Sequence, residues 1–131
     1  MFQHIGTVSL FVADQDRAKD FYTDKLGFEL VTDVPLYPGA TIRWLSVKPS
    51  STAATELILY LPDDNWSHYA QVVGKPQALT VNVSDITTLH QDLQAKGVTF
   101  VQEPDTQPWG TYATIEDSEG NHLILVEQSA P

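Results

Sequence analysis

The side chains with the clearest chemical potential in this sequence are Glu56 and His122, which lie in two apolar stretches. Glu56 belongs to "TELILYL" (55–61) and His122 to "HLILVE" (122–127), and both stretches alternate as strands do. A histidine titrates near neutral pH, and a carboxylate can bind an amine or a hydroxyl. These two side chains therefore indicate either a polar base of a pocket, which would bind an amine or a hydroxyl of a ligand, or general acid–base catalysis. In the alternative reading, Glu56 reaches solvent or pairs with Arg43 on the neighbouring strand for structure alone.

Aromatic side chains form the second informative set. Walls made of aromatic rings favour flat or apolar ligands, although rings also fill cores and dimer contacts, which is the reading favoured for Trp44. Trp109 in "PWG" (108–110) directly precedes a predicted strand and is therefore expected at the rim of a site. The segment "DNWSHY" (64–69) suits either a lid or a dimer contact. The rings on or next to the predicted strands and loops of the site are Phe11, Trp44, Tyr60, Trp66 and Trp109.

Composition excludes several classes of function. The 131 residues include no cysteine, which removes disulfides, zinc–thiolate sites, iron–sulfur clusters and cysteine nucleophiles. The formal net charge of −10 argues against nucleic acid as a partner. The longest apolar run, "LILYL" (57–61), predicts a strand and no membrane span. The first residues, "MFQHIGTVSL", lack the pattern of a signal peptide. A cytoplasmic location is therefore expected. Phosphate-binding glycine loops, nucleophile elbows and H-E-x-x-H motifs do not occur.

A pattern that occurs twice must position these side chains. In the first copy, an alternating stretch (8–12) predicts a strand, Asp14 a helix N-cap, and Gly27 the end of that helix. The helical stripe between them consists of Ala18, Phe21, Tyr22 and Lys25–Leu26. Strands are then expected from residue 28, over 41–47 and over 55–61.

The second copy repeats this series in the same order. A strand is expected over 79–83, Asp85 caps a helix with the apolar stripe Ile86, Leu89 and Leu93, and Gly97 ends it. Strands follow from residue 98, over 111–116 and over 122–127, with a hairpin at "DSEGN" (117–121). Each half thus reads β-α-β-β-β, which predicts one domain over 1–131 with modules 1–61 and 77–128 and a linker 62–76.

These stretches together resemble the vicinal oxygen chelate superfamily, which contains glyoxalase I, extradiol dioxygenases and bleomycin-resistance proteins. The resemblance is carried by "VSLFVADQDRAKDFYTDKLGFEL" (8–30), "LTVNVSDITTLHQDLQAKGVTF" (79–100) and "PWGTYATIEDSEGNHLILVEQ" (108–128). It implies an α+β fold of two βαβββ modules whose curled mixed sheets surround one cavity, usually within a homodimer. It implies no single reaction, because the superfamily hosts several.

Strand alternation selects the residues expected to face that cavity. Leu57, Leu59, Leu123 and Leu125 are expected under the helices, and the intervening residues on the concave side. With Trp109 added at the rim, the predicted ligand contacts are Thr7, Ser9, Phe11, Glu56, Ile58, Tyr60, Asn82, Trp109 and His122.

The resemblance also bears on metal binding. Metal-dependent members hold a divalent ion at positions that correspond here to Thr7, Glu56, Ala78 and Ile124, of which only Glu56 is a good ligand. No metal ligands and no cofactor are therefore expected, with a shifted Glu56–His122–His68 site as the alternative. His4, His68 and His90 otherwise read as surface or loop residues.

The sequence thus predicts a small-molecule-binding protein with a degraded metal site, whose ligand is aromatic or apolar and lies between the modules. Its partners would be that ligand and a second copy of the chain. The alternative is an enzyme of the same superfamily, namely a metal-dependent or acid–base lyase, isomerase or dioxygenase. A third reading is a degenerate member that acts through protein contacts alone.

Overall fold

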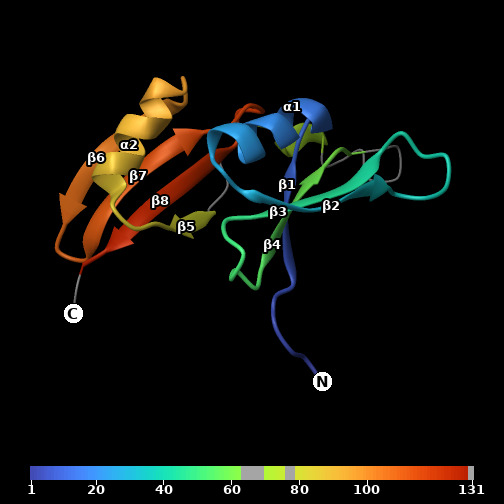
Figure 1. Cartoon of the computed structure of the whole chain (residues 1–131), viewed down its shortest axis with the longest axis horizontal. Coiled ribbons are helices and arrows are strands. Elements are labelled where there is room, and N and C mark those ends of the chain that lie inside the picture. The colour runs from blue at the N-terminus through green and yellow to red at the C-terminus, as the bar shows by residue number, and fades with distance from the viewer. Residues whose placement is uncertain (63–69, 76–78, 130–131) are drawn as a thin grey trace. The chain divides into compact units, whose positions relative to one another are not determined.

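The computed structural model describes residues 1–62, 70–75 and 79–129, so Trp66, His68 and Ala78 lie outside the described residues. The chain divides into two compact units, Met1–Gly74 and Lys75–Pro131. In each unit the described residues form one four-stranded mixed sheet with its helix following the first strand (Figure 1). The expected βαβββ order is confirmed in both units. The cavity expected between the modules stays a prediction.

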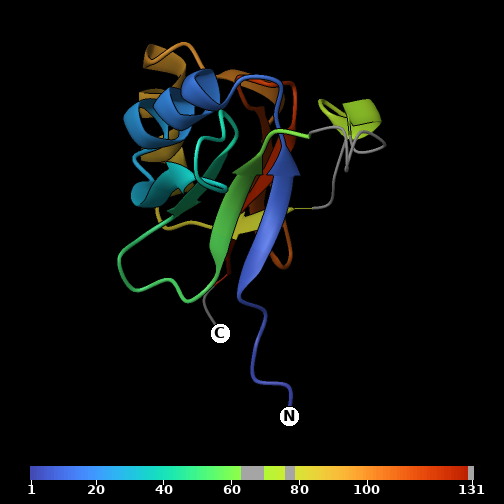
Figure 2. The same cartoon turned by 90° about the vertical axis from the view of Figure 1, so that its right-hand side faces the viewer.

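The first unit contains the sheet β1–β4–β3–β2, in which the first strand pairs with the last. Parallel pairing places β1 and β4 side by side (Figure 2). The apolar residues that alternate along these strands form the buried layer under α1, with Leu10, Leu45 and Leu59 fully buried. The elements are β1 (Thr7–Phe11), α1 (Gln15–Asp20), a π-helical segment (Phe21–Lys25), β2 (Glu29–Pro35), β3 (Arg43–Lys48) and β4 (Glu56–Tyr60).

The helix of this unit begins as predicted but changes its winding. The Asp14 side chain accepts a hydrogen bond from the Arg17 N–H, and Gly27 has φ 72° where the helix has ended. From Phe21 onward the turn widens, and the Leu26 N–H bonds to the Phe21 carbonyl five residues earlier. Both Phe21 and Tyr22 are thereby buried, although they are adjacent in sequence.

Gln15 ties the helix to the sheet in a way that no local pattern indicated. Its Nε2 donates to the carbonyls of Arg43 and Leu59 at 2.8 and 2.9 Å, and its Oε1 accepts from the Arg43 N–H at 3.1 Å. The regular β3–β4 pairing covers Ser46–Ile58 and Val47–Leu57. Beyond this pairing, the Gln15 amide takes the place of direct hydrogen bonds between β3 and β4. It reaches the two strands from the side of the sheet that packs against the helix.

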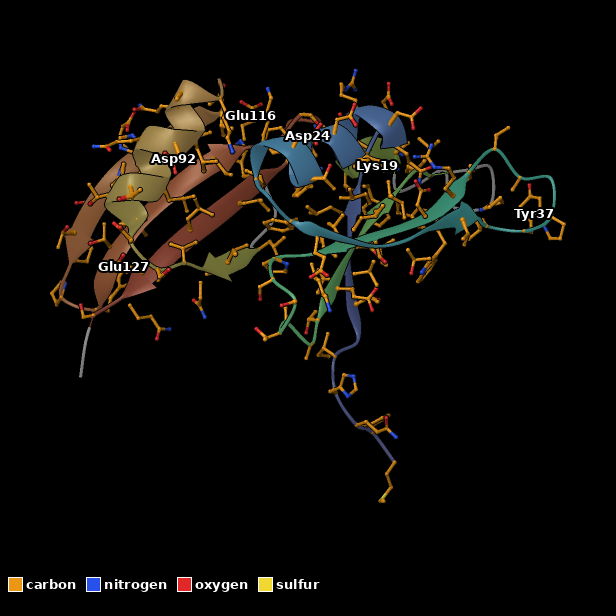
Figure 3. The ribbon with its side chains drawn as sticks, viewed as in Figure 1. Lys19, Asp24, Tyr37, Asp92, Glu116 and Glu127 are labelled. Carbon is orange, nitrogen blue, oxygen red and sulfur yellow. The ribbon has the colours of Figure 1, made fainter. Side chains whose placement is uncertain are left out.

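The second unit contains the sheet β5–β8–β7–β6. Asp85 accepts a hydrogen bond from the Thr88 N–H, as expected of a cap, and Gly97 has φ 79° at the other end of the helix. Glu127 supplies a second cap, because its Oε1 accepts from the Ile86 N–H at 2.7 Å (Figure 3). The elements are β5 (Thr80–Asn82), α2 (Ile86–Ala95), β6 (Thr99–Gln107), β7 (Gly110–Glu116) and β8 (His122–Gln128).

The turn between β7 and β8 is built around a buried carboxylate. Asp117 Oδ1 accepts from the N–H groups of Glu119 and Asn121, both at 2.8 Å, and Gly120 has φ 83°. This matches the hairpin predicted from "DSEGN". None of the helices in the described part of the chain has the length and apolar character of a membrane span.

Candidate functional site

Six of the predicted ligand contacts lie together on the face of the first sheet that is turned away from α1. The register pairs Thr7 with Glu56, Ser9 with Ile58, and Phe11 with Tyr60 across β1 and β4. Leu10, Leu57 and Leu59 alternate with them and are buried under the helix, so strand alternation places these six on the opposite face. We call this surface the open face of the first sheet.

Aromatic rings occupy one end of this open face. Phe11 and Tyr60 meet edge to face, with ring centroids 6.1 Å apart and planes 76° apart. Trp44 on β3 shares the face, because it lies two residues from Ser46, which is paired with Ile58. Its side chain is partly exposed. The open face therefore offers aromatic surface together with small polar groups.

The middle of the open face is shielded from water. Ile58 is 1% exposed and Ser46 is 0% exposed, and the Ser46 hydroxyl has no hydrogen-bond partner among the described residues. Ser46 was missed by reasoning from the sequence, although the alternation of "TIRWLSV" places it on the same face as Trp44. The Ser46 hydroxyl is therefore a buried polar group on this face without a hydrogen-bond partner among the described residues.

Glu56 lies half-buried at the other end of the open face. The proposed pairing of Glu56 with Arg43 is wrong, because Arg43 lies on the helix side of β3 and binds acidic residues there. Its Nε is 2.8 Å from Asp33 and its Nη1 is 2.9 Å from Asp16. The error has a physical reason: Arg43 is an odd number of residues from Ser46, so the two side chains leave the strand in opposite directions.

Asp33 on β2 joins Arg43 to α1, since it also lies 2.8 Å from Lys19 Nζ. Partial burial by itself raises the pKa of Asp33, but hydrogen bonds and positive charge from Lys19 and Arg43 hold it below its usual value. The hydrogen bond to Asp33 raises the pKa of Arg43 in turn, against the effect of burial. This cluster fixes β2 and β3 under the helix.

Asp33→Asn is expected to destabilise the protein at pH 7 by about 1–2 kcal/mol, because it removes charge from two charge-assisted hydrogen bonds. The pKa of Asp33 is lower in the folded than in the unfolded chain, so its charged form stabilises the fold above an unfolded pKa of about 3.9. This contribution is lost as the pH falls through the folded-state pKa. Urea unfolding from pH 7 to pH 3 should show the difference between variant and wild type shrinking below about pH 4.

Asp24→Asn is the matched control, because Asp24 is exposed beyond α1 (Figure 3). Its stability relative to wild type should change little over the same range. A deficit of Asp33→Asn that stays constant from pH 7 to pH 3 would contradict the assignment.

In the second unit, Asn82 and His122 lie on the face of the sheet turned away from α2. The register pairs Thr80 with Ile124 and Asn82 with Val126, and places His122 opposite Glu116 on β7. His122 is half-buried and Asn82 exposed. Glu116, which is half-buried as well, was not among the predicted residues; only the cross-strand register reveals it as the acidic neighbour of His122.

Trp109 lies in the two-residue connection between Gln107 and Gly110, which pair with each other. Its ring stacks on Tyr112, with centroids 5.6 Å apart and planes 30° apart, and it remains 52% exposed. Tyr112 pairs with Val126 and so lies on the same face as Asn82 and His122. Trp109 is thus an exposed ring that stacks on a second ring, and its place at the rim of a site stays a prediction.

A hollow of about 620 Å³ opens in the second unit where β5 and β8 end beside the start of α2. Asn82 is the predicted contact that lines it. The carboxylates at this hollow are engaged in capping α2, Asp85 with Thr88 and Glu127 with Ile86. The remaining lining is Val83, Ser84, Thr87, Val126 and Gln128.

The donor set at the expected metal positions does not fit a divalent ion. Thr7 and Glu56 are paired neighbours, but they offer one carboxylate and one hydroxyl, and Ile124 carries no donor atom. Within 1–62, 70–75 and 79–129, no three His, Asp or Glu side chains gather closely enough to hold a metal.

The other histidines differ in their surroundings. His4 is exposed, as expected. His90 departs from the expected surface role, because it is half-buried on α2, packs edge to face on Phe100 at 4.7 Å, and has Nε2 beside the Glu103 carboxylate. It links α2 to β6 and is not part of the open face of the first sheet.

Known proteins share both the sequence pattern and the fold. The family model Glyoxalase/Bleomycin resistance protein/Dioxygenase superfamily matches residues 3–125. The uncharacterized protein YetH of Bacillus subtilis (strain 168) is 35% identical over 130 residues, which cover 97% of this chain and 100% of YetH.

Two solved structures share the fold over nearly the whole chain. TnmS3, described as an antibiotic binding protein from Streptomyces sp. CB03234, has 33% identity and a TM-score of 0.83, with 98% of both chains covered. A protein of this superfamily from Sphaerobacter thermophilus DSM 20745 has 32% identity and a TM-score of 0.83, over 97% of this chain and 98% of its own.

Proposed function

This chain belongs to the glyoxalase/bleomycin resistance protein/dioxygenase superfamily, and from that premise we propose that it binds a small aromatic or apolar molecule. The observation that carries the proposal is the open face of the first sheet, where Phe11, Tyr60 and Trp44 present aromatic surface beside small polar groups. Rings of this kind, with a few polar groups among them, favour flat ligands.

The similarity to TnmS3 supports the same conclusion, because that protein is described as binding an antibiotic and is 33% identical to this chain. Binding requires only a shaped surface with suitable contacts, whereas the metal-dependent reactions of the superfamily require donors that Thr7 and Ile124 do not supply. The alternative of a metal-dependent enzyme is accordingly not favoured.

Polar residues are proposed to orient the ligand. On the first sheet these are Thr7, Ser9 and Glu56, which lie on the same face as the aromatic and apolar contacts of β1 and β4. On the second sheet they are Asn82 and His122, with Trp109 as an exposed aromatic contact. Glu56 and His122 act here as ligand contacts. The homodimer and the cytoplasmic location stay predictions.

The proposal can be tested with 2-naphthol, a flat bicyclic probe that carries one hydroxyl. In ¹⁵N-resolved NMR titrations, we expect saturable shifts concentrated at the amides of β1, β3 and β4 in the first unit. Tyr60→Leu should weaken the affinity by about 3- to 10-fold, which corresponds to the loss of an aromatic contact.

Tyr37→Leu provides the matched control, because Tyr37 is 59% exposed in the connection between β2 and β3, away from the open face (Figure 3). It should bind 2-naphthol as the wild type does. Equal affinities of the two leucine variants, or the lack of saturable shifts in the wild type, would contradict the proposal. Binding that disappears on dialysis against EDTA and returns with a divalent ion would instead support the metal-dependent alternative.

A further inference from the structure

We propose that Ser46 selects ligands that carry a hydroxyl or carbonyl group, through a hydrogen bond made at the middle of the open face of the first sheet. This inference rests on the proposed binding function and adds to it a specificity-determining residue. Ser46 is 0% exposed, yet its Oγ has no hydrogen-bond partner in the described part of the chain. A buried hydroxyl without a partner is costly, so native structures rarely keep one without a use.

The surroundings of Ser46 show why a ligand group fits this place. The register aligns Ser9, Ile58, Ser46 and Thr32 in one row across the four strands. The adjacent row contains Phe11 and Tyr60, which pair with each other. A flat molecule that packs on these rings would therefore place one edge beside Ser46. A polar substituent at that edge would be close enough to form a hydrogen bond with the Ser46 hydroxyl.

The backbone of Ser46 is held in position from the helix side. The regular pairing of β3 with β4 ends at Ser46 and Ile58, and directly beyond it the Gln15 amide binds the backbone of Arg43 and Leu59. Leu45 and Val47, on either side of Ser46, are fully buried under the helix. The backbone that carries the hydroxyl is thus held in place before a ligand arrives, which lowers the ordering cost of binding.

The chemistry of the hydroxyl defines the class of ligand. Serine Oγ can donate to a carbonyl or accept from a hydroxyl, so the partner needs one such group at the edge of its apolar body. A site built for a hydrogen bond discriminates against analogues that lack the polar group, because the protein group is then left unpaired. Because Oγ is shielded in the ligand-free chain, we expect the side chains around it to shift on binding.

The test compares 2-naphthol with 2-methylnaphthalene, which has the same ring system but no hydroxyl. In Ser46→Ala, we expect the affinity for 2-naphthol to fall about 5- to 10-fold and the affinity for 2-methylnaphthalene to stay the same. The melting temperature of ligand-free Ser46→Ala should rise, because an unpartnered buried hydroxyl has been removed. Ser51→Ala removes an exposed hydroxyl from the same unit and should change none of these quantities.

The outcomes separate this inference from the proposed function. If the wild type binds both probes and Ser46→Ala binds them with unchanged affinities, the role of Ser46 is refuted while the binding function stands. If neither probe binds the wild type, both proposals fail. A melting temperature that falls in Ser46→Ala would show that the hydroxyl has a structural partner, which also overturns the inference. Ser46→Cys keeps a side chain of similar size with a weaker donor, and an intermediate loss for 2-naphthol alone is expected.

Discussion

Gln15→Ala is expected to lower the free energy of unfolding by about 3 kcal/mol, because three hydrogen bonds in a buried layer are lost together. The Gln15 side chain supplies two donor bonds, to Arg43 and Leu59, and one acceptor for the Arg43 N–H. Alanine leaves these backbone groups unpaired between β3 and β4, where the Leu59 bond is buried and the two Arg43 bonds are partly buried. Urea unfolding followed by circular dichroism measures the difference.

Gln91→Ala is the matched control, because Gln91 is exposed on α2 and its replacement by alanine suits a helix. It should change the stability by less than about 0.5 kcal/mol. A similarly small effect of Gln15→Ala would mean that the β3–β4 backbone finds other partners. Since Gln15 also holds the strand next to Ser46, its loss should weaken the binding of 2-naphthol even where the variant remains folded.

Gly110→Ala is expected to destabilise the second unit by about 3 kcal/mol, through steric overlap and backbone strain together. A Cβ at this position would lie 2.3 Å from the Glu127 carbonyl oxygen and 3.0 Å from Gln128 Cα, and both are backbone atoms that cannot rotate away. Gly110 also has φ 149°, which residues with a side chain rarely adopt. Thermal unfolding of the variant should show the loss directly.

Gly39→Ala separates the two causes, because Gly39 has φ 81° but no described atom lies within 4 Å of the place that an alanine Cβ would take. Strain alone should cost it about 1 kcal/mol. Equal losses at the two glycines would show that β8 can move aside, and that the close approach of β7 to β8 at Gly110 is not required for folding.

The elements of the fold could be predicted because their signals are local. Asp14 and Asp85 cap the helices, and Gly27 and Gly97 follow their ends with positive φ, as short sequence windows indicated. The π-helical widening at Phe21 gave no such signal. It accommodates two adjacent aromatic residues in the core, and the gain from burying both depends on tertiary packing.

For the candidate site, the sequence could predict only which side chains share a face of a strand, because that follows from strand alternation. Alternation placed Phe11, Glu56 and Tyr60 on one face of the sheet. The same rule places Arg43 on the other face, so it would have excluded a pairing of Arg43 with Glu56. The role of Gln15 depends on partners 28 and 44 residues away. No window of sequence contains such a contact. The unfilled hydroxyl of Ser46 likewise follows from burial in three dimensions.

Strand order has a consequence for how the chain is made. In each unit the first strand pairs with the last, β1 with β4 and β5 with β8. The start of α2 also depends on Glu127 of β8 for a cap. A nascent chain that has just left the ribosome through α2 therefore lacks the neighbour that β5 requires. Each sheet can therefore be completed only after its final strand has emerged, so the emergence of β4 and of β8 sets the earliest time at which each module can close.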